Sequence, residues 1–204
     1  MGCATCLATF AALETHESTK ERAARLDELE PNCRCQAVSV SEHSPGCVGD
    51  GEALIRILVA PQHTNKNGHP RAASLADAER GGLSVFREHL ALDEDILIIA
   101  RELVGKARAI QGKKAGVSGV LRIECNTLRS FCLHPENEPC YCVYDTALQN
   151  RRSHAEAFQR VAGLSAGVAD TRRAALFDRI KACFIPVDEF RGGLLKSLAP
   201  ERGS

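Results

Sequence analysis

Ten cysteines stand in the 204-residue sequence, and most of them fall in close pairs. Cys3 and Cys6 form a C-x-x-C motif, and Cys33 and Cys35 form a C-x-C motif. Two neighbouring sulfurs are what a metal site or a redox dithiol requires, because both must converge on one point. Two such pairs supply the four thiolates of a tetrahedral zinc site. We therefore predict a structural zinc ion bound by Cys3, Cys6, Cys33 and Cys35.

Other readings of these cysteines stay open. Cys47 or His43 could replace one of the four ligands, or the thiols could pack as small apolar side chains without a metal. A redox dithiol at Cys3-x-x-Cys6 is disfavoured, because such motifs follow a strand and only two residues precede Cys3.

A second group of metal-ligating residues has the spacing C-x-H-x5-C-x-C. It consists of Cys132, His134, Cys140 and Cys142. Strand alternation would place Cys140 and Cys142 on one face, which suits joint metal ligation and joint core packing equally well. The two cysteine groups could also contribute to one shared site.

A third set of candidate residues contains no cysteine. Arg56 interrupts an otherwise apolar strand, and His63, Ser84 and Glu124 follow in or near further strands. Arginine binds phosphate in bidentate fashion, a serine hydroxyl can bond ribose, and a glutamate can stabilise a developing oxocarbenium ion. This set resembles the catalytic residues of ADP-ribosyltransferase-like domains, which implies a nucleotide-handling cleft. The alternative is an ordinary polar sheet face.

A further resemblance covers roughly residues 50–160. The chain is similar there to a small bacterial family without an assigned function. The residues that carry the resemblance are Arg56, Pro61, His63, Gly82, Leu83, Ser84, Val85, Arg87, His154 and Ala155. It implies one core domain and supplies no catalytic role.

Charge is balanced over the whole chain but not along it. The 26 basic and 26 acidic residues give a net charge of zero, which excludes a globally basic nucleic-acid binder. Residues 101–129 hold seven basic and two acidic side chains, a formal charge of +5. This segment is either a nucleic-acid contact or a solvated helix face. The predicted contact residues are Arg101, Lys106, Arg108, Lys113 and Lys114.

These residues must be positioned by an irregular series of helices and strands. We predict helices over 5–29, 74–79, 93–110 and 170–182, with another beginning at Ser153, and strands over 36–40, 53–60, 82–86, 117–125 and 140–145. No regular βαβ order is present, so we predict an α+β fold. Its sheet is mixed or antiparallel with flanking helices. A helical, cysteine-rich arm (1–50) precedes the core domain (51–190) and a frayed tail (191–204).

The chain shows no signal peptide and no apolar run of about 18 residues, so we expect a cytoplasmic protein of bacterial type. Met1-Gly2-Cys3 resembles a lipid-attachment start, but Cys6 stands where Ser or Thr is required, so we expect no lipid anchor. We predict a zinc-binding accessory subunit of a larger assembly, with protein partners and a nucleic-acid contact. The alternative is a nucleotide-handling enzyme with an ADP-ribosyltransferase-like cleft.

Overall fold

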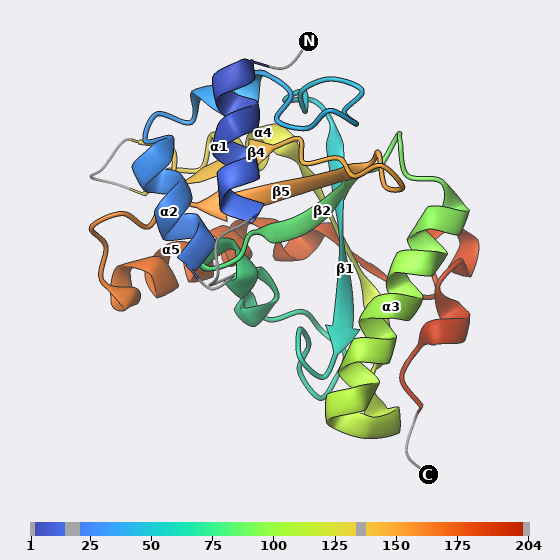
Figure 1. The fold of residues 1–204 in the computed structure, drawn as a ribbon. Coiled ribbons are helices and arrows are strands. Elements are labelled where there is room, and N and C mark those ends of the chain that lie inside the picture. The colour runs from blue at the N-terminus through green and yellow to red at the C-terminus, as the bar shows by residue number, and fades with distance from the viewer. Residues whose placement is uncertain (1–2, 15–20, 134–137, 202–204) are drawn as a thin grey trace.

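One antiparallel sheet organises the molecule. The computed structural model describes residues 3–14, 21–133 and 138–201. In that part of the chain six strands pair in the order β4-β5-β2-β1-β3-β6 (Figure 1). Every pairing is antiparallel, so the predicted α+β class is confirmed and the sheet is antiparallel rather than mixed. The strands are β1 (Ala53–Ala60), β2 (Leu83–Arg87), β3 (Gly116–Glu124), β4 (Tyr141–Tyr144), β5 (His154–Gln159) and β6 (Phe184–Pro186).

Helices cover both faces and the N-terminal side of this sheet (Figure 1). The α-helices are α1 (Ala4–Glu14), α2 (Arg22–Leu29), α3 (Asp93–Gln111), α4 (Cys125–Arg129) and α5 (Ala166–Ile180). The 3-10 helices are η2 (Arg34–Ala37), η3 (Ala72–Glu79), η4 (Gly112–Lys114), η5 (Lys181–Cys183), η6 (Phe190–Gly193) and η7 (Lys196–Leu198). None of the described helices is long and apolar enough to cross a membrane.

Two local predictions need correction, and a third is only partly described. Residues 15–20 of the helix predicted over 5–29 lie outside the described residues, and α1 and α2 occupy its two ends. The strand predicted over 36–40 is wrong, because η2 occupies the start of that segment. The helix predicted from Ser153 is also wrong. That segment forms β5, which pairs with β2 on one side and β4 on the other, and these two ladders override the local capping pattern.

Helix α3 forms as its charge pattern predicts. Acidic residues fill its first turn and Arg108 its last, which complements the helix dipole. Gly112 follows with φ of 70°, a positive value that glycine adopts without strain. Ile98 is 50% exposed and Ile110 is 84% exposed, so neither belongs to the buried face of the helix. The residues that face the core are Ile96, Ile99, Ala100, Val104 and Ala107.

Alternation along β1 divides the core between two sides of the sheet. Leu54 and Leu58 pack with α5 and η3 on one side, whereas Ile55 and Ile57 pack with α3 and the C-terminal segment on the other. Leu195 is fully buried in this second cluster. The described part of the predicted tail is therefore packed rather than frayed.

The N-terminal arm has its own apolar cluster, which packs against β4 and β5 at one edge of the sheet. Phe10 and Leu13 of α1 and Leu26 of α2 pack there with Tyr144 and Phe158. The rings of Phe10 and Tyr144 lie 4.9 Å apart, and those of Tyr144 and Phe158 lie 6.1 Å apart. Aromatic contacts thus join the arm to β4 and β5.

Candidate functional site

Strands β1 and β2 pair over a short distance and then separate. Their ladder joins Leu54 to Arg87 and Ile55 to Phe86. By contrast, β1 pairs with β3 along its whole length. Figure 1 shows β1 turning away from β2 and β5 beyond this junction. The backbone of β2 near Ser84 therefore needs partners other than β1.

Arg56 supplies one of those partners. Its side chain is almost fully buried, and its Nη1 donates to the Ser84 carbonyl oxygen at 3.1 Å. Its Nη2 donates to Asp77 Oδ2 at 2.7 Å. Burial lowers the pKa of the Arg56 guanidinium, and the Asp77 carboxylate opposes that shift. An arginine pKa remains far above neutrality, so a fixed positive charge sits where the strands part.

His63 lies next to this charge and is neutral. Its Nδ1 accepts a hydrogen bond from the Val59 backbone N–H at 3.1 Å, which leaves the ring proton on Nε2. Burial first, and then the charge of Arg56, lower the pKa of His63 to about 4. The imidazole is therefore a hydrogen-bond donor through Nε2 at neutral pH.

A cavity of about 320 Å³ opens beside these residues, and we call it the β1–β2 cleft. Its lining residues come from β1, the loop of His63, η3, β2, α3 and the segment from Arg151 to the start of β5. Its apolar lining includes Ile57, Phe86, Ile99, Leu103 and Ile110. Its polar lining is Arg56, Gln62, His63, Asp77, Ser84, Glu102, Lys106, Arg151 and His154.

Contacts within the protein hold the side chains of Arg151 and His154 in the cleft wall. Nη2 of Arg151 lies 2.6 and 2.7 Å from the two carboxylate oxygens of Glu102. The His154 ring packs on Phe86 with centroids 5.8 Å apart, and its Nδ1 lies 3.0 Å from the Thr146 carbonyl oxygen. The cleft wall is thus built before any ligand arrives.

Three of the four residues predicted for nucleotide handling line this cleft, and Glu124 does not. Arg56, His63 and Ser84 meet there. Glu124 is exposed at the end of β3, opposite Ala53 at the start of β1. Because β3 runs antiparallel to β1, its last residue lies at the opposite end of β1 from the cleft. Asp77 is not predicted from its sequence pattern, although a buried arginine requires some carboxylate or carbonyl partner.

The predicted nucleic-acid contact residues all lie on α3 or η4, and all five are exposed. Lys106 lines the cleft. Arg108 donates from Nε to the Ala115 carbonyl oxygen at 3.0 Å, so it secures the end of its own helix. The basic segment therefore divides between the cleft and the outer surface.

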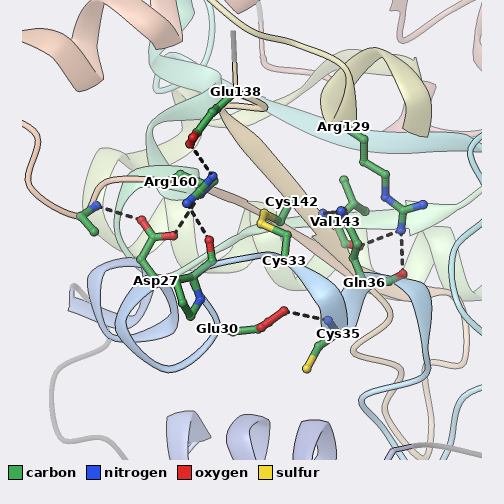
Figure 2. Close-up of a disulfide and its surroundings, with 12 residues drawn as sticks. Asp27, Glu30, Cys33, Cys35, Gln36, Arg129, Glu138, Cys142, Val143 and Arg160 are labelled. Carbon is green, nitrogen blue, oxygen red and sulfur yellow. Dashed lines mark hydrogen bonds and ion pairs between the residues drawn. A yellow bond between two sulfur atoms is a disulfide. The ribbon is translucent and has the colours of Figure 1, made fainter. Parts of the chain in front are cut away.

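Four of the ten cysteines gather at a second place, where the arm meets β4. Two disulfides join Cys6 to Cys35 and Cys33 to Cys142, with Cα atoms 5.6 and 6.0 Å apart. Figure 2 shows the Cys33–Cys142 bond and, apart from it, the Cys35 sulfur directed away from that bond. We call Cys6, Cys33, Cys35 and Cys142 the cysteine cluster.

The cluster differs from both predicted metal sites. Cys3 is an exposed free thiol, and Cys142 joins from the second predicted group instead. His134 lies outside the described residues, Cys132 is exposed, and Cys140 packs in a different core cluster from Cys142. Cys140 precedes the first residue of β4, so strand alternation does not place it beside Cys142.

Within the described residues, no group of three or more His, Cys, Asp or Glu side chains is arranged to hold a metal ion. Zinc binding stays a prediction, because a disulfide and a metal site use the same sulfurs.

Polar contacts fix the backbone around the cluster (Figure 2). Glu30 Oε1 accepts a hydrogen bond from the Cys35 N–H at 2.8 Å. Cys33 has φ of 51°, an uncommon left-handed conformation for a residue other than glycine. Arg129 donates to the carbonyl oxygens of Gln36 and Val143, which ties η2 to β4.

Cys3 lies directly before α1. The backbone N–H of Cys6, and secondly that of Thr5, lower the pKa of the Cys3 thiol. Helix N-termini favour the thiolate in this way, since their free N–H groups point at the sulfur.

Comparison with known proteins adds no relative. No protein-family model, curated protein or solved structure matches the chain. The function must therefore come from the β1–β2 cleft and the cysteine cluster themselves.

Proposed function

We propose that the protein binds a phosphorylated small molecule of the nucleotide class in the β1–β2 cleft. One observation carries this proposal. The buried guanidinium of Arg56 is fixed at the parting of two strands, in the wall of an open cavity that the neutral His63 also lines. A preorganised charge beside an imidazole donor suits an anionic group.

The balance of charge in the cleft supports an anion. Arg56, Lys106 and Arg151 carry positive charge, whereas Asp77 and Glu102 carry negative charge. These five charged side chains give the lining one net positive charge. Lys106 is exposed at the rim, where a flexible ammonium can meet a phosphate without a buried-charge penalty.

The apolar wall supports a ring system attached to that anion. Phe86, Ile99 and Leu103 line the cleft beside the polar residues. Small-molecule sites commonly combine such walls with a few convergent polar groups, in cavities of roughly 300–1,000 Å³. A volume of about 320 Å³ fits a mononucleotide-sized ligand better than a polymer.

The proposed role is binding rather than ADP-ribosyl transfer. That reaction was expected to use Glu124, which lies outside the cleft. The ligand class of the enzyme alternative is kept and its reaction is not. The zinc-binding accessory role, its protein partners and the nucleic-acid contact remain predictions beside this proposal.

Calorimetric titration with AMP, ADP and adenosine tests the proposal. We expect AMP and ADP to bind and adenosine to bind at least about tenfold more weakly, since a charge-assisted contact contributes on the order of 1.5–3 kcal/mol. Lys106→Gln should weaken ADP binding.

Lys113→Gln is the matched control, because Lys113 belongs to the same basic segment but lies outside the cleft lining. The proposal fails if adenosine binds as well as AMP or if none of the three binds. Equal weakening by the two lysine variants would also contradict it, and would favour a diffuse nucleic-acid contact.

A further inference from the structure

A free cysteine stands beside a buried disulfide at the start of α1. Cys3 is exposed, whereas Cys6, three residues later, is buried, with a relative exposure of only 6%. Cys6 is bonded to Cys35, whose own exposure is only 5%. A thiol on the surface is thus followed within one helical turn by a disulfide in the interior.

Contacts at the helix start hold Cys3 against that turn. The Cys3 carbonyl oxygen accepts a hydrogen bond from the Leu7 N–H at 2.9 Å, so Cys3 begins the hydrogen bonding of α1. Cys6 is the third residue of that helix, and side chains three positions apart at a helix start are neighbours. The Cys3 thiol and the Cys6–Cys35 bond therefore lie within one turn of each other.

We propose that Cys3, Cys6 and Cys35 form a thiol–disulfide exchange centre, in which Cys3 carries the buried disulfide to the surface. The Cys3 thiolate attacks the Cys6 sulfur. A Cys3–Cys6 bond forms, the Cys6–Cys35 bond breaks, and Cys35 leaves as a thiolate that takes up one proton. No electrons are gained or lost in this step.

An external dithiol completes the reaction. One of its sulfurs attacks the exposed Cys3 sulfur, the Cys3–Cys6 bond breaks, and Cys6 leaves as a thiolate that takes up one proton. The second sulfur of the dithiol then attacks the first, which breaks the mixed disulfide and releases Cys3 as a thiol. The external dithiol is oxidised to a disulfide, and the Cys6–Cys35 pair is reduced to two thiols. Cys3 returns to its starting state, so it passes electrons to a disulfide that solvent does not reach directly.

The neighbouring disulfide serves as an internal reference. Cys33 and Cys142 are also buried, but the Cys35 sulfur is directed away from their bond (Figure 2). Their reduction should therefore not depend on Cys3. The two disulfides share one environment and differ in their access to the surface thiol.

Trypsin makes the two bonds separately measurable. Arg34 lies between Cys33 and Cys35, so cleavage after Arg34 puts these cysteines on different peptides. Cys3 and Cys6 share the peptide 1–20, where an internal disulfide lowers the mass by two hydrogens. The native full-length protein is treated with limiting dithiothreitol, quenched with acid at set times, alkylated and mapped.

The decisive comparison is Cys3→Ser against Cys47→Ser, because Cys47 is another exposed free cysteine outside the cluster. We expect Cys3→Ser to slow reduction of Cys6–Cys35 by at least about tenfold, because the relay thiol is lost. Reduction of Cys33–Cys142 should keep its wild-type rate, and Cys47→Ser should change neither rate. The wild type should show a transient Cys3–Cys6 linkage.

Equal Cys6–Cys35 reduction rates in wild type and Cys3→Ser would overturn the proposal. So would the absence of Cys3–Cys6 linkage at every time point. Stoichiometric zinc that protects Cys6 and Cys35 from alkylation in the purified protein would also overturn it, and would support the metal site instead. Because Cys3 is exposed, its serine variant leaves the core intact, and the Cys33–Cys142 rate verifies this.

Discussion

The β1–β2 cleft and the cysteine cluster hold their residues in opposite ways. The cleft residues Arg56, His63 and Ser84 lie within 29 consecutive positions and are positioned by strands, an ion pair and backbone hydrogen bonds. The cluster draws on residues from Cys6 to Cys142, and covalent bonds join them. The cleft should therefore survive reduction, whereas the attachment of the arm should depend on it.

The largest effect should come from removing the Cys33–Cys142 bond. Its partners are 109 residues apart, and a loop of that length stabilises the fold by about 4–5 kcal/mol in the chain-entropy account. We expect the double variant Cys33→Ser/Cys142→Ser to lose about that much in urea unfolding, with ADP binding to the folded protein unchanged.

The variant Cys47→Ser is the control, because Cys47 is outside both bonds. A loss below about 1 kcal/mol would show that the bond does not constrain the unfolded chain as proposed. Loss of ADP binding in the folded double variant would erase the contrast between the two regions.

An intermediate effect should appear in the pH dependence of stability. Burial lowers the pKa of His63 to about 4 from 6.5, so its contribution is present above pH 6.5 and is lost as the pH falls toward 4. Burial raises the pKa of Asp145, on the arm side of the sheet, to about 6 from 3.8. Its contribution is present below pH 3.8 and is lost as the pH rises through 6.

The two contributions oppose each other between pH 4 and 6, and each amounts to about 3 kcal/mol. Urea unfolding of His63→Gln should show stability that falls as the pH rises through this window. Asp145→Asn should show the reverse slope. Parallel pH profiles in the two variants would mean that neither group titrates as its burial requires.

The smallest effect should follow from Asp77→Asn. Arg56 would keep its bond to the Ser84 carbonyl oxygen but lose the carboxylate, and Asp77 is half exposed, so we expect a loss of about 1–2 kcal/mol in unfolding free energy. Asp178→Asn is the control. It removes an ion pair with Lys181 in which both side chains are exposed, and it should change stability by less than about 0.5 kcal/mol. Equal losses in the two variants would show that the buried guanidinium does not depend on Asp77.

Sequence patterns predicted the elements that depend on local chemistry. Helix α3 follows from its charged ends, and β1 follows from its apolar run. The same patterns predicted that Arg56, His63 and Ser84 lie together, and these residues line one cleft because they stand in or beside the neighbouring strands β1 and β2.

The errors arose where distant pairing decides the structure. The capping pattern at Ser153 predicts a helix, yet β5 pairs on both sides. Glu124 was placed in the cleft without knowledge that β3 is antiparallel to β1. The partner of Cys33 could not be read from spacing, because many pairings of ten cysteines are compatible with one sequence.

The short ladder between β1 and β2 has a mechanical consequence. It divides the sheet into two three-stranded halves, β4-β5-β2 and β1-β3-β6. The halves are joined by the short β1–β2 ladder and by the hydrophobic core that packs against both of them. Arg56 belongs to one half and the Ser84 carbonyl oxygen to the other, so their hydrogen bond links the two halves of the sheet. A ligand bound in the cleft would stabilise this link between the halves. Slower hydrogen exchange of the backbone amides of β1 and β2 would show that effect.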